Sequence, residues 1–425
     1  MKDSKATVVP PLVIIGALFF IFGFITWLNG TLIPFLKIAC ELTYAQALLV
    51  TFAFYIAYVF LALPSSFILQ KTGFKNGMAL GLVVMAGGAL VFVPAAQARS
   101  YPLFLVGLFI QGAGLALLQT ASNPYATILG PLESAAKRIS ILGICNKVAG
   151  ALSPIVIGAV VLKGAEELEK QLAGPISPAA KEALLQQLAG RVITPYLVMA
   201  AALVVLAVLI RASGLPEVQA GAAGPAAAAP EPTGSIWQHP HLLLGALAMF
   251  LYVGAEVIAG DTIIQYGRSQ GISLDVARNF TSFTLAAMLV GYVVGIVAIP
   301  RYVTQQTALR LCTFVGLAFT AGIVLTHGLA SVACVALLGL ANALMWPAIF
   351  PLSIKGLGNL TERGSALVVM GIGGGAVLPY LYGKLTEVLG LQNAYLLLVP
   401  CYLYILFFAL KGHTYRPKPV LAAAA

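Results

Sequence analysis

The chain has 425 residues, of which 60% are hydrophobic and only 9% are charged, and its mean hydropathy is +0.96. Soluble domains carry about 25% charged residues, so this composition excludes an ordinary water-soluble protein. About 20 apolar residues in a helix cross a bilayer core about 30 Å thick, and stretches of that length recur along the whole sequence. We therefore predict an integral membrane protein.

Twelve apolar stretches predict twelve transmembrane helices and hence an all-α fold. The first stretch follows Lys2 and Lys5, as a signal peptide would, but it is too long and has no A-x-A cleavage site, so we expect it to be retained. The five cysteines stand singly, without metal-ligand spacing, and predict buried thiols. The predicted spans, in chain order, are 11–36, 44–69, 76–97, 101–129, 138–162, 192–212, 241–266, 279–300, 306–327, 329–354, 363–386 and 391–411.

The orientation is predicted from the Lys and Arg residues in the connections. Fourteen of the 24 fall on the side that carries both termini, nine fall on the other side, and Lys147 falls inside a span. Because basic residues collect on the cytoplasmic side, we expect both termini to be cytoplasmic. This asymmetry accounts for most of the net charge of +10, so no nucleic-acid partner is expected.

A segment rich in Pro, Ala and Gly, residues 213–236, has few large apolar groups and predicts a flexible linker. It divides the chain into two predicted six-helix bundles, 1–212 and 237–425. Several residues recur between them at a fixed offset of 225, which predicts two parallel structural repeats. Gly114, Arg138, Gly150 and Pro154 recur as Gly339, Arg363, Gly375 and Pro379.

Four quoted stretches carry a resemblance to a known family. The basic connections "LQKTGFK" and "RYVTQQTALR", in a chain of two six-helix halves, resemble the major facilitator superfamily. The stretches "GLALLQTASNPYATILGP" and "FLYVGAE" are similar to its fucose/proton symporter family, which includes bacterial glucose/galactose and N-acetylglucosamine carriers. The likeness covers nearly all of the membrane part and weakens at the 163–191 loop, the linker and the tail.

The resemblance implies the major facilitator fold, with two pseudo-symmetric six-helix bundles that give alternating access. It implies a sugar held near the midplane between the halves, mostly by the spans 11–36, 101–129, 241–266 and 329–354. It also implies a multi-pass protein of the bacterial inner membrane, with the lipid bilayer as its solvent and one chain acting alone as a monomer.

A sugar site needs amides and hydroxyls for hydrogen bonds and an aromatic face for the ring carbons. Amides inside hydrocarbon are costly unless they have hydrogen-bond partners, so amides inside spans are candidates for binding a ligand. The alternative is that such amides tie neighbouring helices together. The substrate-binding candidates of this kind are Asn29, Gln119, Asn123, Asn146, Asn342 and Trp346, with Trp27 as a second aromatic.

Three charged groups inside or near spans are candidates for the translocation site: Lys147, Glu256 and Asp261. A charge at the membrane centre costs about 2.5–3.5 kcal/mol on insertion scales, so it needs a reason to be there. At 1.5 Å per residue, Lys147 lies roughly 14 Å along its span and Glu256 roughly 22 Å, so we expect water or substrate between them.

We take Lys147 and Glu256 as the charge-bearing part of the site, both for substrate binding and for coupling. Lys147 could instead extend its ammonium into a wet cavity without any coupling role. Glu256 and Asp261 point about 140° apart on one helix and are not expected to share a site. Asp261 could be a coupling residue or simply a solvated residue at the membrane edge.

One departure from the resembled family concerns coupling. The fucose carrier has an aspartate where this chain has Gly30 and a glutamate where this chain has Gln119. Both carboxylates are missing, so proton coupling by that route cannot be carried over. The coupling ion, proton or sodium, is therefore open from sequence alone, and no organic cofactor is expected.

The expected function is a secondary active transporter that imports a hexose or an N-acetylhexosamine by cation-coupled symport. A non-transporting sugar sensor of the same fold and a drug/proton exporter are alternatives. No nucleophile with a base, H-x-x-x-H motif or Walker loop appears, so an enzyme or an ATP-driven pump is not expected. The loop 164–191 predicts a helical hairpin, with Glu166 and Lys170 placed for an i,i+4 pair, either solvated or acting as a lid.

Overall fold

The computed structural model describes residues 11–128, 135–215, 235–299, 301–357 and 360–415, and every regular element within them is a helix. We call residues 11–215 the first half and 235–415 the second half. The helices of the first half are α1 (Pro11–Thr26), α2 (Asn29–Ala39), α3 (Tyr44–Ala47), α4 (Leu49–Gln97), α5 (Tyr101–Ile128), α6 (Ala135–Val161), α7 (Ala165–Ala173), α8 (Pro178–Gly190) and α9 (Ile193–Ala212).

The second half begins with a short 3₁₀ turn, η2 (Ile236–Gln238), and then repeats the pattern of long helices. Another 3₁₀ turn, η4 (Gly371–Gly373), joins α17 to α18. The helices are α10 (Pro240–Asp261), α11 (Ile263–Ser269), α12 (Leu274–Ala277), α13 (Phe280–Ala298), α14 (Gln305–Leu325), α15 (Gly328–Asn342), α16 (Met345–Ile354), α17 (Thr361–Met370), α18 (Gly374–Asn393) and α19 (Leu398–Leu410).

Eleven segments of the described chain are long and apolar enough to cross a membrane, and each of the twelve predicted spans overlaps one of them. The last of them, Arg363–Thr414, has 52 residues, far more than one crossing of about 20 residues needs. It is interrupted at Gly390, whose φ of 78° only glycine adopts readily, and this break separates two predicted spans. Gly73, with φ 73°, breaks the 49-residue α4 in the same way. The predicted span 192–212 is α9, and the helix before it, α8, extends the same apolar segment back to Pro178.

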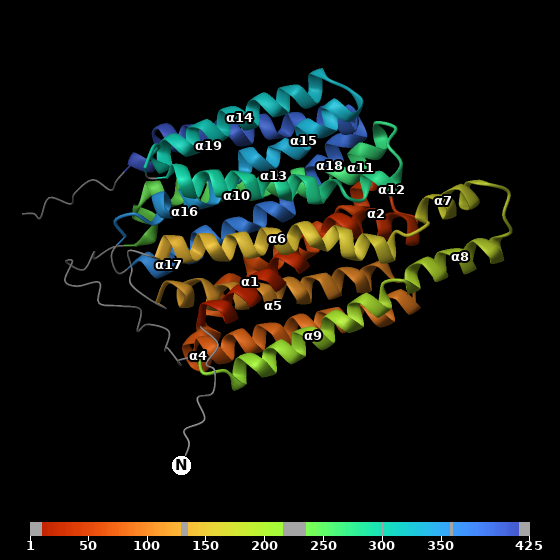
Figure 1. Ribbon diagram of the computed structural model, residues 1–425, viewed down its shortest axis with the longest axis horizontal. Coiled ribbons are helices and arrows are strands. Elements are labelled where there is room, and N and C mark those ends of the chain that lie inside the picture. The colour runs from red at the N-terminus through yellow and green to blue at the C-terminus, as the bar shows by residue number, and fades with distance from the viewer. Residues whose placement is uncertain (1–10, 129–134, 216–234, 300, 358–359, 416–425) are drawn as a thin grey trace, which may run out of the picture.

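The two halves lie side by side along their long axes, as the separation of warm and cool colours shows (Figure 1). The largest contacts between the halves are those of α6 with α13 and of α4 with α18, and α2 also contacts α10 and α11. Large apolar side chains on the outer faces stay exposed, for example Val198, Val205 and Val208 of α9. Exposed aliphatic groups of this kind are expected where lipid, not water, is the solvent.

The glycines that recur at the offset of 225 mark close contacts in both halves. A methyl group on Gly114 would lie 2.5 Å from the carbonyl oxygen of Gly81, and one on Gly339 would lie 2.0 Å from that of Thr284. Both sites therefore accept only glycine without a backbone shift, because small residues let membrane helices approach closely.

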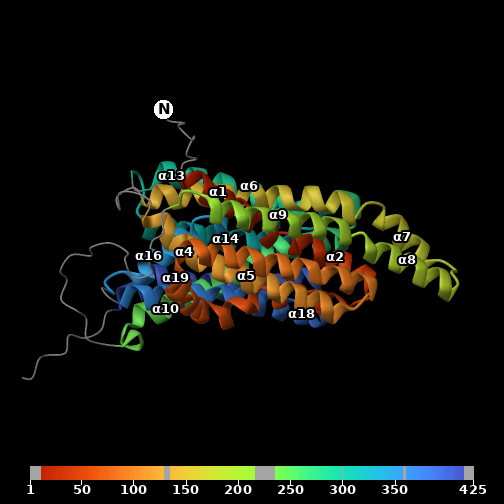
Figure 2. The same ribbon diagram turned by 90° about the horizontal axis from the view of Figure 1, so that it is seen from below.

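The predicted hairpin between residues 164 and 191 is confirmed as α7 and α8, which project beyond the bundle (Figures 1 and 2). The predicted Glu166–Lys170 pair is present at 3.7 Å. We call the end of the bundle that carries this hairpin the hairpin end.

Candidate functional site

The ammonium of Lys147 meets the carboxylate of Glu256 in the middle of the bundle. Lys147 Nζ donates a hydrogen bond to Glu256 Oε1 at 2.7 Å, and the two side chains are only 9% and 10% exposed. Lys147 lies on α6 of the first half and Glu256 on α10 of the second, so this ion pair joins the halves. An ion pair buried to this degree is costly to separate without a replacement for each partner.

The expectation that water or substrate separates these two groups is wrong for this state of the molecule. The two helices begin nearer the terminal side than the predicted spans do, α6 at Ala135 and α10 at Pro240. Lys147 and Glu256 then differ by four residues in depth, about 6 Å at 1.5 Å per residue. The long side chain of lysine spans that difference.

Trp27 covers the ion pair from the side of α1. Lys147 Nζ lies 4.7 Å from the centre of the Trp27 ring, a cation–π contact. The ring occupies a slot between two glycines, because a methyl group on Gly150 would lie 2.4 Å from it and one on Gly260 would lie 2.3 Å from it. Gly150 belongs to the first half and Gly260 to the second, so the indole is held by both.

Two of the predicted amides are fully buried and only partly satisfied. Asn29 is 1% exposed, and its Nδ2 has no partner among the described residues. Asn342 accepts a hydrogen bond from the Tyr402 hydroxyl at 3.0 Å, and its Nδ2 also lacks a partner in this part of the chain. Each amide thus retains donor capacity that a hydroxyl-rich ligand could use.

The remaining predicted residues have different surroundings. Asn146 donates to the Phe19 carbonyl at 3.3 Å and so ties α6 to α1, the helix-tying role that we weighed against binding. Trp346 is half-buried and stacks on Phe350 with ring centres 6.0 Å apart. Gln119 is half-buried on α5. The side chain of Asn123 lies outside the described residues.

Asp261, at the end of α10, is buried rather than solvated, and the edge alternative is therefore wrong. Its side chain is 1% exposed. Thr51 of α4 donates a hydrogen bond to Asp261 Oδ2 at 3.2 Å, while Oδ1 has no partner among the described residues. Glu256 and Asp261 have different hydrogen-bond partners, Lys147 and Thr51.

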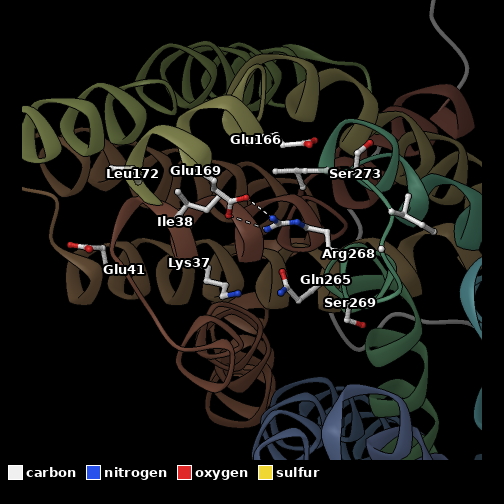
Figure 3. Close-up of a pocket in the computed structure, with 13 residues that line it drawn as sticks. Lys37, Ile38, Glu41, Glu166, Glu169, Leu172, Gln265, Arg268, Ser269 and Ser273 are labelled. Atoms are coloured by element: carbon white, nitrogen blue, oxygen red, sulfur yellow. Dashed lines mark hydrogen bonds and ion pairs between the residues drawn. The ribbon is translucent and has the colours of Figure 1, made fainter. Parts of the chain in front are cut away.

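A cavity of about 790 Å³ lies at the hairpin end, where both halves contribute to its wall. Charged and polar side chains line it together with apolar ones such as Ile38 and Leu172 (Figure 3). Its charged and polar lining includes Lys37 and Glu41 at the end of α2, Glu166 and Glu169 of α7, and Gln265 and Arg268 of α11. The cavity therefore places charged side chains of both halves next to one another at this end of the bundle.

A second ion pair joins the halves in this cavity. The guanidinium of Arg268 binds the carboxylate of Glu169 through both oxygens, one of them at 3.0 Å (Figure 3). Their side chains are 24% and 28% exposed. The other ion pairs of the hairpin stay within the first half, since Lys181 binds Glu41 and Arg99 binds Glu182.

Thr51, Glu169 and Arg268 were missed by sequence reasoning. A threonine in an oily span carries no distinguishing signal, and charged residues in connections are usually solvated. Arg268 and Glu169 are 99 residues apart, so only the folded arrangement brings them together.

Comparisons with known proteins agree with this arrangement. A sequence profile described as the Major Facilitator Superfamily matches residues 15–380. The chain is 37% identical over 398 residues to a glucose/galactose transporter of Brucella abortus biovar 1 (strain 9-941), covering 93% of this chain and 92% of that protein. It is 30% identical over 413 residues to the L-fucose-proton symporter of Escherichia coli (strain K12), covering 96% and 94%.

Solved structures give the same result. The crystal structure of a Major Facilitator Superfamily transporter, FucP, in the outward conformation matches with a TM-score of 0.71 at 29% identity. The match covers 94% of this chain and 98% of that one. The resemblance read from the sequence motifs is confirmed.

Proposed function

Because the chain belongs to the Major Facilitator Superfamily, we propose that it imports a hexose or an N-acetylhexosamine by cation-coupled symport. It is a transporter rather than an enzyme, as are its relatives. Support for the substrate class comes from the names of those relatives, a glucose/galactose transporter and an L-fucose-proton symporter. Both cover more than nine tenths of this chain, so the likeness extends over the whole membrane part.

The observation that carries the proposal is the Lys147–Glu256 pair, which is buried between the halves. In alternating access the halves separate on one side at a time, which must strain or break such a contact. A sugar can then satisfy both charges, since hydroxyls accept from an ammonium and donate to a carboxylate. In the state described here the two charges satisfy each other directly.

Other groups around the pair suit a polyol. The Trp27 ring offers a flat apolar face to ring carbons, and its Nε1–H has no partner among the described residues. Asn29 and Asn342 retain unpartnered donors. We assign sugar hydroxyls to these donors, with Gln119 and Asn123 as further candidates from α5.

For the direction of transport, we place both termini in the cytoplasm and the hairpin end outside. The basis is the excess of Lys and Arg on the terminal side. The two six-helix bundles, 1–212 and 237–425, then rock about the mid-bundle contacts with 213–236 as their linker, in a single chain. This state, with Glu169 bound to Arg268, is one in which the outer ends of the halves touch.

For the coupling ion we propose the proton, because the relative from Escherichia coli is named as a proton symporter. Among the described residues there is no group of three or more His, Cys, Asp or Glu that could hold a metal ion. Sodium remains an outcome that the transport assay distinguishes.

The test is counterflow in proteoliposomes. Purified protein is reconstituted with an excess of one unlabelled sugar inside, and entry of labelled hexoses and N-acetylhexosamines is followed with and without a pH or sodium gradient. We expect transient accumulation for at least one sugar, stimulated by an inward proton gradient. Binding of sugar without movement would favour a sensor, and movement of apolar cations without any sugar would favour a drug exporter.

A further inference from the structure

Asp261 is a buried acid without a counterion among the residues that the structure describes. Its side chain is 1% exposed, and its one described hydrogen bond comes from the Thr51 hydroxyl at 3.2 Å. The titratable side chains that face it are Tyr44 of α3, Tyr55 of α4 and Glu256 of α10, all of them acids. No basic side chain pairs with it in the described part of the chain.

The contacts of Asp261 come from both halves. Thr51 belongs to α4 of the first half, whereas Asp261 belongs to α10 of the second. Gly30 of α2, also in the first half, lies close against the same carboxyl group: a methyl group there would lie 3.4 Å from Asp261 Oδ1 and only 2.9 Å from Thr281 Oγ1. The carboxyl group therefore sits in a pocket that exists only while the halves touch.

This placement makes closure depend on a proton. A carboxylate that loses water and gains neither a cation nor a full set of donors is strongly disfavoured, whereas a neutral acid tolerates the same pocket. Oδ1 has no donor in the described structure, so it is the oxygen that can carry the proton. When the halves separate at the hairpin end, water can reach the group and solvate the anion.

We infer that Asp261 is the proton-binding group of the symport cycle, and that its protonation permits the hairpin end to close. This inference rests on the proposed function. Water at the hairpin side supplies the proton, which binds to Oδ1 of the open carrier. The neutral acid is then enclosed between Thr51 and Gly30, and the proton returns to water on the opposite side later in the cycle.

The inference separates two transport modes. Counterflow exchanges sugar across the membrane and needs no net proton movement, whereas accumulation driven by a pH gradient does. An amide at position 261 imitates the neutral acid, so Asp261→Asn should close without a proton. We expect Asp261→Asn to retain counterflow and to lose accumulation.

The experiment uses the full chain in proteoliposomes with a one-unit pH gradient and the sugar found by counterflow. One proton per sugar gives wild-type accumulation of about tenfold, because one pH unit is a factor of ten in proton activity. Asp261→Asn should give a ratio near one with counterflow intact. Wild-type accumulation by the folded variant, or loss of counterflow together with accumulation, overturns the inference.

A relocation variant keeps the test decisive if Asp261→Asn does not fold. In Gly30→Asp/Asp261→Gly the carboxyl group enters the same pocket from the other half, with Thr281 turning aside. Recovery of pH-driven accumulation supports the inference, and counterflow without accumulation contradicts it. Sodium-driven accumulation by the wild type that Asp261→Asn abolishes would also contradict the proton assignment. Failure of wild-type counterflow would instead reject the proposed function.

Discussion

Within the described part of the chain, two ion pairs join the halves of this protein, and they differ chiefly in their access to water. Lys147 and Glu256 are each about nine tenths buried at mid-bundle, whereas Glu169 and Arg268 are about one quarter exposed in a polar cavity at the hairpin end. Removing one partner of a buried pair costs about 3–5 kcal/mol, because the other charge stays buried alone. Exposed pairs contribute about 0.2–1 kcal/mol.

The difference in burial suggests separate roles in transport for the Lys147–Glu256 and Glu169–Arg268 ion pairs. The mid-bundle pair is energetically demanding, so something must replace it whenever the halves separate, and we assign that task to the sugar. The hairpin pair contributes little and can break with water as its replacement. It therefore shifts the balance between conformations without blocking either one.

The largest effect is expected for a substitution at Lys147. Lys147→Met leaves Glu256 buried without a cation, so we expect a loss of about 3–5 kcal/mol in stability and more than about tenfold slower counterflow. Thermal unfolding in detergent and uptake in proteoliposomes measure the two effects.

The matched control is Lys147→Met/Glu256→Gln, which removes both charges. The double variant should regain much of the lost thermal stability while still failing to transport. If the single variant is as stable as the wild type, the pair is not the demanding contact that the comparison requires.

The next largest effect is expected from overpacking beside the Lys147–Glu256 pair. Gly260→Ala places a methyl group 2.3 Å from the Trp27 ring, and such overpacking costs about 1–3 kcal/mol. We expect slower counterflow and a change in tryptophan fluorescence when Trp237 and Trp346 are both replaced by Phe.

Gly87→Ala is the control, because a methyl group at Gly87 meets nothing within 4 Å. Alanine there should leave transport unchanged. Equal effects at the two glycines would mean that helix propensity, rather than the Trp27 slot, explains the result.

Arg268→Met tests the Glu169–Arg268 pair, and we expect a small shift from the closed toward the open state of the hairpin end. Loss of about 0.2–1 kcal/mol from the closed hairpin end shifts the balance of states by up to about fivefold, without loss of folding. Labelling of a cysteine at Leu274, a buried residue of the cavity wall, should become faster by a similar factor in a variant whose five native cysteines are serines. Arg99→Met, whose partner Glu182 lies in the same half, should leave that rate unchanged.

The smallest effect is expected at Lys170, whose partner Glu166 lies one helical turn away on α7. Such i,i+4 pairs contribute about 0.3–0.5 kcal/mol. Lys170→Met should therefore transport at the wild-type rate. A clear loss would show that the hairpin itself, and not only its Glu169–Arg268 contact, takes part in transport.

The sequence predicted the architecture well, because its strongest signals are long apolar stretches and repeated glycines. Gly114 and Gly339 both lie at close helix contacts, as the repeat required. The sequence also identified Lys147 and Glu256 as site candidates, since charged residues within transmembrane spans are rare. Their direct contact could not be predicted, because the depth counted along a predicted span does not include where each helix begins or the length of the lysine side chain.

Other features depend on chain packing that one sequence does not contain. Asp261 falls at the end of a span, where a solvated residue would look the same, and only the approach of Thr51 from 210 residues away shows its burial. The role of Asn146 as a tie to Phe19 follows equally from how α6 meets α1.

The central claim is that the halves separate at the hairpin end during transport. It can be tested by the distance between spin labels at Ala98→Cys and Val276→Cys, two exposed positions on opposite halves, in a variant whose five native cysteines are serines. In proteoliposomes we predict two distance populations, whose ratio changes with sugar and shifts toward the longer distance in Arg268→Met. A single distance that sugar, pH and Arg268→Met all leave unchanged, in protein that performs counterflow, would contradict the account.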